Sequence, residues 1–295
     1  MRRIAAGYEP AIFGRKPREL RIDFASCRDY VLHRIQGASI DAEPFRHAFI
    51  DNIFPRNFFE SLRRHMRRFK HSPEVTFRAQ DNPAFQNRRY NLENNNDDIT
   101  ATIRAIFEDH DVRMALLAKF YLAPTPEFCS ALRIHEEFEY VFTAAGRFQN
   151  IHVDIPPKFM SFVFYIPERD VTSDEAEKNA TILYDRNLKP QYNSRFQANS
   201  VCLFAPHFAS YHGFSSTIER DVLVMFYVEP IELEKWRRLR TDNQDTPPFD
   251  GIRDAIESKL ARHPLIEFGH DPETLAMERQ ACLVNAPQGR VFLTT

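Results

Sequence analysis

The sequence predicts a mainly β fold with flanking helices, that is, an α+β protein. The first support is a set of apolar runs at 159–166, 199–204 and 220–227, whose length and content of Val, Phe and Tyr are typical of buried strands. The second is a helical spacing of apolar residues from Phe58 to Phe69. The third is the ratio of 27 phenylalanines to 8 glycines, which indicates a bulky aromatic interior.

Residues 1–44 are expected to form an N-terminal arm, because they carry many arginines and little periodic apolar pattern. The arm could lie on the domain, act as a lid or a dimer contact, or extend into solvent. From Phe45 the pattern changes, and 45–54 reads as a strand that enters a helix at Pro55, a residue favoured in a first helical turn. Arginines alternate with the apolar positions of this helix, and we interpret them as its solvated face.

The polar segment 72–98 is expected to be a long loop, and loops of this length are often functional. It could close over a substrate, with Arg88, Arg89 and Tyr90 as contacts. Helices are then expected over 99–110 and 112–121.

The segment 128–141 is expected to be a strand. It carries three candidate pocket residues, Arg133, His135 and Tyr140. Each of them is equally well explained as an ordinary polar position of a strand.

Further along, 168–178 is charged and is expected to be a loop, whereas 181–184 reads as a strand. Beyond Pro230 the pattern becomes helical, so 231–295 is expected to be a helical C-terminal extension. Pro247 and Pro248 mark the best candidate for a linker. These boundaries leave a central domain over 45–230.

Composition excludes several classes of partner. The 39 basic residues balance the 41 acidic ones, so there is no basic footprint for nucleic acid. No apolar stretch reaches the roughly 18 residues of a membrane span, and no apolar signal core is present. We therefore expect a cytoplasmic protein without a membrane partner, and a homodimer is one possible assembly.

A motif with metal-binding chemistry lies at His152-Val153-Asp154. Side chains alternate along a strand, so His152 and Asp154 project from the same face. A second histidine from a neighbouring strand would complete a two-histidine, one-carboxylate set with open coordination positions. His212 is the preferred second histidine, and His207, five residues earlier, competes with it.

Together with Arg220, eight residues after His212, this set resembles the Fe(II)/2-oxoglutarate-dependent oxygenase superfamily in its prolyl-hydroxylase-like pattern, over about residues 45–230. The resemblance implies a double-stranded β-helix, or jelly-roll, core. It implies that His152, Asp154 and His212 hold Fe(II), and that Arg220 pairs with the distal carboxylate of 2-oxoglutarate. O2 is the remaining cosubstrate.

The resemblance also supports the choice of His212 over His207. His212-Gly213-Phe214, followed by a short turn and an apolar strand, is similar to the His-Gly-Val pattern of the family. Two departures concern the cosubstrate. The spacing from His212 to Arg220 is short for the family, and Val222 stands where one subgroup has serine. Arg133 and Tyr140 are the further residues expected at the cosubstrate.

The implied activity is hydroxylation of a C–H bond in a small molecule or an amino-acid derivative, with succinate and CO2 as coproducts. Asp154 supports hydroxylation, since halogenases of this family lack the carboxylate. A peptidyl or protein hydroxylase is an alternative. Another is a non-catalytic, cupin-like metal-binding barrel, although cupins usually offer more histidines in the first motif.

Overall fold

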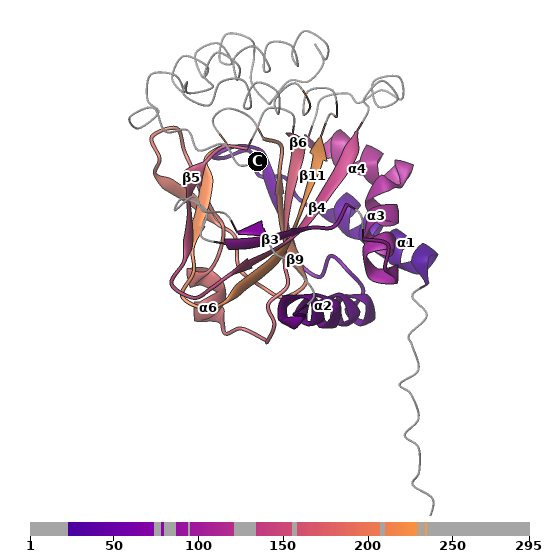
Figure 1. Ribbon diagram of the computed structural model, residues 1–295. Coiled ribbons are helices and arrows are strands. Elements are labelled where there is room, and N and C mark those ends of the chain that lie inside the picture. The colour runs from indigo at the N-terminus through magenta and orange to yellow at the C-terminus, as the bar shows by residue number, and fades with distance from the viewer. Residues whose placement is uncertain are drawn as a thin grey trace, which may run out of the picture.

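Two antiparallel sheets face each other in the computed structural model, which describes residues 23–73, 78–79, 87–93, 95–120, 134–154, 158–206, 210–228, 230 and 234 (Figure 1). The large sheet has seven strands in the order β1-β9-β6-β11-β4-β3-β2, and the small sheet has four in the order β5-β10-β7-β8. Every strand pair among the described residues is antiparallel. The fold is the expected jelly roll, mainly β with flanking helices.

The strands of the large sheet are β1 (His47–Ile50), β2 (Arg78–Ala79), β3 (Asn87–Asn91), β4 (His135–Thr143), β6 (Lys158–Tyr165), β9 (Ser200–Phe204) and β11 (Arg220–Val228). Those of the small sheet are β5 (Phe148–His152), β7 (Ile182–Tyr184), β8 (Pro190–Asn193) and β10 (His212–Ser215). The apolar runs at 159–166, 199–204 and 220–227 thus form β6, β9 and β11, as predicted.

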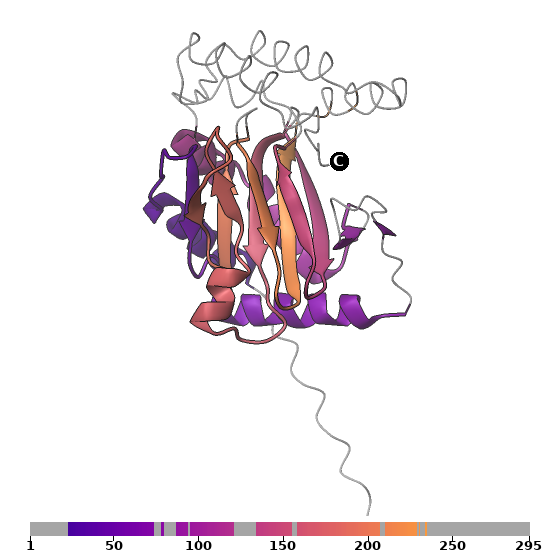
Figure 2. The ribbon, with the colours of Figure 1, turned by 90° about the vertical axis from the view of Figure 1, so that its left-hand side faces the viewer.

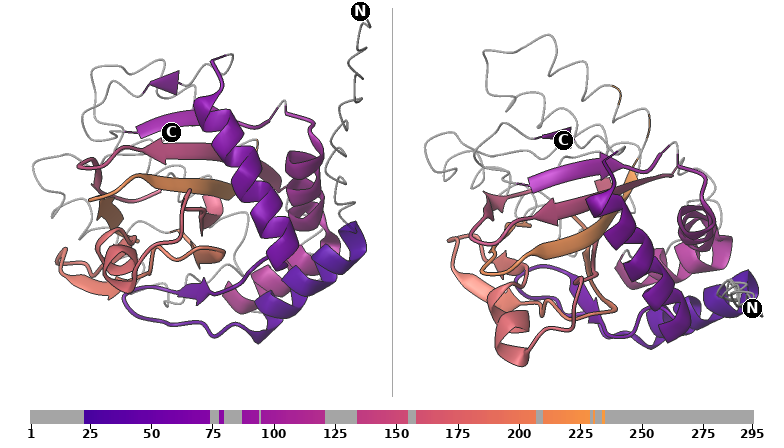
Figure 3. Two further views of the ribbon diagram at one scale, coloured as in Figure 1. Left: turned by 90° about the horizontal axis from the view of Figure 1, so that it is seen from below. Right: turned by 60° about the horizontal axis from the view of Figure 1, so that its bottom comes forward.

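The described helices are α1 (Phe24–Gly37), α2 (Arg56–His71), α3 (Asp98–Glu108), α4 (His110–Phe120) and α6 (Ser173–Lys178). Figure 1 shows α1, α3 and α4 together beside the large sheet, and Figures 2 and 3 show α2 running across its strands. The helices predicted from Pro55 and over 99–110 and 112–121 correspond to α2, α3 and α4. No helix in the described ranges combines the length and the apolar character that crossing a membrane requires.

The strands β6, β9 and β11 of the large sheet are buried on both faces, and β11 shows how their residues divide. Leu223, Met225 and Tyr227 join the main core beneath the helices. Val222, Val224 and Phe226 point the other way and form a second cluster between the sheets. Because both faces are covered, the strand reads as one continuous apolar run.

Three segments differ from the expectation. The predicted loop 72–98 contains β3, which pairs residue by residue with β4. The predicted loop 168–178 contains α6, which begins with a capping box between Thr172 and Glu175, a local signal for a helix start. Part of the predicted arm is the helix α1, whose Cys27, Val31 and Ile35 are buried in the main core.

The division of the chain into an arm, a central domain and a C-terminal extension stays a prediction. The start of the arm (1–22) lies outside the described residues. So does the predicted extension (231–295), apart from residue 234.

Candidate functional site

The predicted metal ligands meet between the two sheets. His152 ends β5 and His212 begins β10, and the two residues are direct partners in the antiparallel register. Their ring centroids are 4.1 Å apart, and Asp154 follows β5 by two residues. One donor atom from each of the three side chains lies within 4.8 Å of the others. All three ligands are buried: His152 is 4% exposed, and Asp154 and His212 are each 7% exposed.

The histidine rings have defined neighbours. The Nδ1 atom of His212 lies 2.9 Å from the backbone oxygen of Ser210, so Nδ1 donates there and Nε2 keeps its lone pair for a ligand. Burial lowers the pKa of His212, an effect that the charge of Asp154 partly offsets. The neutral imidazole, which is the form that binds metal, is therefore favoured. The Nε2 atom of Gln149 lies 3.0 Å from Nε2 of His152.

Asp154 is held at both carboxylate oxygens. Lys158 Nζ donates to Oδ1 at 2.8 Å, and the Ser161 hydroxyl donates to Oδ2. Burial by itself would raise the pKa of Asp154, but the charge and hydrogen bond of Lys158 together with the nearby imidazoles of His212 and His152 outweigh it and hold the pKa below its usual range. Asp154 is thus an ionised carboxylate, which is the state required of a hard oxygen ligand.

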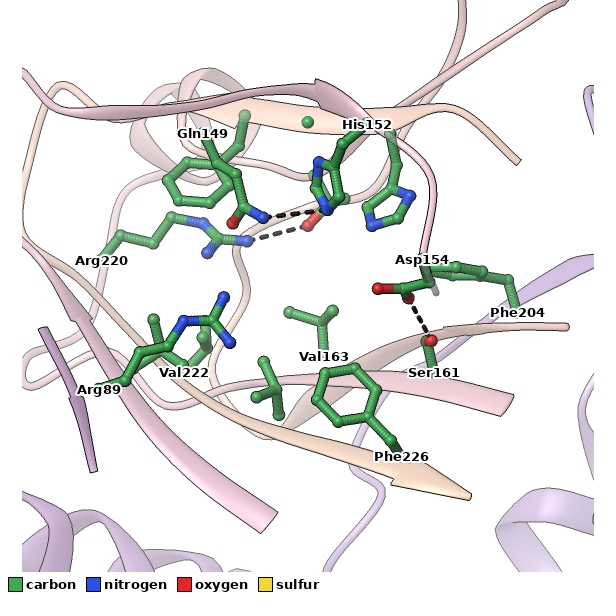
Figure 4. A pocket seen from close by; sticks show the side chains of 16 residues that line it. Arg89, Gln149, His152, Asp154, Ser161, Val163, Phe204, Arg220, Val222 and Phe226 are labelled. Atoms are coloured by element: carbon green, nitrogen blue, oxygen red, sulfur yellow. Dashed lines mark hydrogen bonds between the residues drawn. The ribbon is translucent and has the colours of Figure 1, made fainter. Parts of the chain in front are cut away.

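These residues line a pocket to which both sheets contribute (Figure 4). Its apolar wall comes mostly from the inter-sheet face of the large sheet, and its polar groups gather around the metal ligands and two arginines. Besides the three metal ligands, the lining includes Arg89, Val141, Gln149, Ser161, Val163, Thr181, Phe214, Arg220, Val222, Val224 and Phe226.

Arg220 begins β11 and is 2% exposed. Its Nε donates to the backbone oxygen of Asn179 at 3.0 Å, and its Nη2 donates to Thr181 Oγ1 at 2.9 Å. The guanidinium carbon lies 3.9 Å from the centroid of the Phe214 ring. Within the described part of the chain, no acidic side chain forms an ion pair with Arg220. A buried guanidinium of this kind is suited to an anionic ligand.

The structure places Tyr140 away from the pocket. Its hydroxyl lies 2.9 Å from His65 Nδ1, and the residue belongs to the main core beneath the helices. Because side chains alternate along β4, Val141 faces the pocket and Tyr140 faces the helices. The expectation that Tyr140 contacts the cosubstrate is corrected accordingly. Arg133 and His207 lie outside the described residues, and His135 is exposed at the start of β4.

Four polar residues of the site were not singled out by the sequence as site residues: Gln149, Lys158, Ser161 and Thr181. Lys158 and Ser161 are the polar positions of the otherwise apolar strand β6. A charged residue that opens a buried strand directly after the ligand motif is the signal that could have identified Lys158. Gln149 carries no such signal beyond its position three residues before His152.

Comparisons with known proteins find the fold but no sequence relative. No family model matches the chain, and no curated protein matches it. Among solved structures, a prolyl-4-hydroxylase from Pseudomonas putida has a TM-score of 0.52 at 13% identity, covering 68% of this chain and 98% of its own. A prolyl 4-hydroxylase from Phytophthora capsici has a TM-score of 0.48 at 14% identity, covering 94% and 99% respectively.

At this level of identity the likeness establishes the fold. The chain has the jelly-roll fold of the prolyl hydroxylases, a class of 2-oxoglutarate-dependent Fe(II) oxygenases. In addition, it carries the histidine–aspartate–histidine set that the sequence resemblance predicted.

Proposed function

We propose that the protein is an Fe(II)- and 2-oxoglutarate-dependent dioxygenase that hydroxylates a C–H bond. One observation carries this proposal. A single buried pocket holds both the three-residue ligand set and Arg220, a guanidinium without an acidic partner among the described residues. An oxygenase of this kind needs a metal and a dicarboxylate in one site, and this pocket offers a group for each.

The donor set fits Fe(II). His152, Asp154 and His212 would hold the ion through two imidazole nitrogens and one carboxylate oxygen, and the remaining coordination positions would stay open. Bound Fe(II), together with 2-oxoglutarate, would supply the oxygen-activating chemistry, with succinate and CO2 as coproducts. The role of the surrounding residues is to position the metal ligands. Ser161 and Lys158 fix the Asp154 carboxylate, and Ser210 fixes the ring of His212.

Arg220 would bind the distal carboxylate of 2-oxoglutarate. Its planar fork is already held by Asn179 and Thr181, so little side-chain entropy is lost when the carboxylate binds. Val163, Val222 and Phe214 form an apolar wall nearby. An apolar wall excludes water and strengthens the charge pair.

The substrate we propose is a small molecule or an amino-acid derivative, and a residue within a peptide is the alternative. Both kinds of substrate would be oxidised at the same site, so assays of turnover with small molecules and with peptides are needed to distinguish them. A cytoplasmic location and a homodimer stay predictions.

The test is an anaerobic titration of metal-free protein with Fe(II) and 2-oxoglutarate. The readout is the visible charge-transfer absorption of the chelate. We expect the band in the wild type, its loss in His212→Ala and its retention in His207→Ala. A folded wild-type protein that gives no band would overturn the proposal and favour a non-catalytic barrel.

A further inference from the structure

A second arginine, Arg89, lines the same pocket. It is the central residue of β3 and is 5% exposed. In the register of β3 with β4 it lies opposite Val141, which also lines the pocket. Its neighbours Arg88 and Tyr90 face the other way, because side chains alternate along the strand. Figure 4 shows the guanidinium of Arg89 extending into the cavity on the same side as Arg220.

Arg89 is held at one edge and open at the other. Its Nη1 donates to Glu139 Oε2 at 2.7 Å, and its Nε donates to Asn87 Oδ1 at 3.2 Å. In the described ranges, Nη2 takes part in no hydrogen bond or ion pair. A donor that is prepositioned by an ion pair and left open toward a cavity is suited to a ligand oxygen.

Two more polar atoms on this face lack partners. Asn87 Nδ2 and Thr143 Oγ1 are buried without a hydrogen-bond partner among the described residues. Asn87 and Thr143 are opposite each other in the register, and Thr143 is in turn opposite Arg220. Buried polar atoms are nearly always satisfied in folded proteins. The region between Arg89 and Arg220 therefore offers unused hydrogen-bonding capacity, most of it from donors.

Charge balance identifies the kind of group that would use these donors. Two ion pairs cancel within the site, Asp154 with Lys158 and Arg89 with Glu139. On the proposed function, the charges of Fe(II) and 2-oxoglutarate cancel as well. Arg220 then leaves one positive charge in a dry pocket, where an uncompensated charge is costly. One further negative charge would balance the loaded site.

We propose that Arg89 binds a carboxylate of the primary substrate, so that the enzyme acts on molecules with one carboxylate group. This inference rests on the proposed function and names the substrate class of the same site. The two arginines have different ligands: Arg220 binds the cosubstrate, and Arg89 binds the substrate. Arg89 acts in recognition and takes no part in the oxidation.

The experiment uses the full chain loaded with Mn(II) and 2-oxoglutarate, and measures the melting temperature. The probes are a pool of the twenty L-amino acids, the matching pool of L-amino-acid amides, and pools of acetylated tripeptides with free or amidated C-termini. We expect stabilisation by a pool with free carboxylates and none by its amide counterpart. The peptide pools separate a C-terminal carboxylate from that of a free amino acid.

The variant is Arg89→Met combined with Glu139→Gln, which removes both partners of the ion pair together. We expect the concentration of acid pool for half-maximal stabilisation to rise at least about tenfold, the loss expected for a charge-assisted hydrogen bond. The affinity for 2-oxoglutarate should change less than about twofold, since Arg220 is intact. The matched control is Arg113→Met with Glu136→Gln, an arginine–glutamate pair that also involves β4 but lies outside the pocket lining.

Three results would overturn this inference: acids and amides acting equally, no pool acting at all, or the Arg89 variant losing 2-oxoglutarate affinity. The last result would assign Arg89 to the cosubstrate. Failure of the proposed function is seen separately, as the absence of the Fe(II)–2-oxoglutarate absorption band in the wild type.

Discussion

Replacing Lys158 by methionine should strongly destabilise the metal-free protein and make its stability more dependent on metal. Lys158 and Asp154 are an ion pair at 2.8 Å whose side chains are 3% and 4% exposed. Lys158 Nζ also lies 3.3 Å from the centroid of the Phe226 ring. Methionine keeps most of the length and the packing of the side chain, so the charge is the main property removed.

The magnitude follows from burial. Removing one partner of a buried ion pair costs about 3–5 kcal/mol, because the other charge is left uncompensated. Ser161 still donates to Asp154 in the variant, which favours the lower end of this range. At roughly 2–4 °C per kcal/mol for a domain of this size, the melting temperature should fall by about 6–12 °C.

A divalent ion would restore the missing positive charge. Mn(II) at 100 times its dissociation constant stabilises a protein by about 2.7 kcal/mol. In Lys158→Met the same Mn(II) concentration should stabilise more, because the removal of a nearby cation tightens metal binding. The assay is thermal unfolding with and without Mn(II).

The control for this prediction is Lys178→Met. Lys178 and Asp174 are also separated by four residues and also lie 2.8 Å apart, but both are exposed. Surface pairs contribute little, so this variant should melt close to the wild type. The double variant Asp154→Asn with Lys158→Met should be more stable than Lys158→Met alone. A Lys158→Met protein that melts like the wild type, or that gains no extra stability from Mn(II), would refute the reasoning.

Three further predictions test other parts of the structure. Burial lowers the pKa of His47, although the Phe45 carbonyl and Asp41 act in the opposite direction. The unfolded chain therefore binds the proton more readily, and the stability of the protein falls as the pH drops below about 6.5. In urea unfolding, the stability difference between wild type and His47→Gln should shrink from pH 7.5 to pH 5, and a constant difference would contradict this. Burial raises the pKa of Cys27 and of Cys202 to about 12, so a maleimide should label neither until the protein unfolds. Tyr140→Phe should cost about 1 kcal/mol of stability and leave 2-oxoglutarate affinity unchanged, whereas a weakened affinity would return Tyr140 to the pocket.

The sequence predicted those parts of the fold whose pattern has one physical explanation. The strands β6, β9 and β11 are covered on both faces, and a continuous apolar run follows directly. The pairing of His152 with Asp154 needed only the two-residue period of a strand. The partnership with His212 depended on the family resemblance, because no local pattern fixes which distant strand becomes the neighbour.

The failures also have physical causes. Tyr140 was assigned to the pocket because it is a polar residue of the strand that precedes the metal motif. This strand, β4, is buried along most of its length, and the sequence of a strand covered on both faces does not show which face borders the pocket. The strand β3 was missed because its inward residues are Asn87 and Arg89. A strand that borders a polar pocket lacks the apolar alternation by which strands are recognised.

The ion pair between Asp154 and Lys158 also decides how the metal ligands can be tested. Truncating His152 removes a side chain at a strand end and leaves no buried charge behind. Truncating Asp154 is different, because it removes the carboxylate that pairs with the ammonium of Lys158, whose side chain is only 3% exposed. The cost in stability should be comparable to that of Lys158→Met. Lost activity in Asp154→Ala would therefore mix a lost ligand with a weakened fold. Asp154→Asn combined with Lys158→Met removes the carboxylate without that cost. Because removal of Lys158 also affects metal binding, the comparison of this double variant with Lys158→Met reports the loss of the ligand.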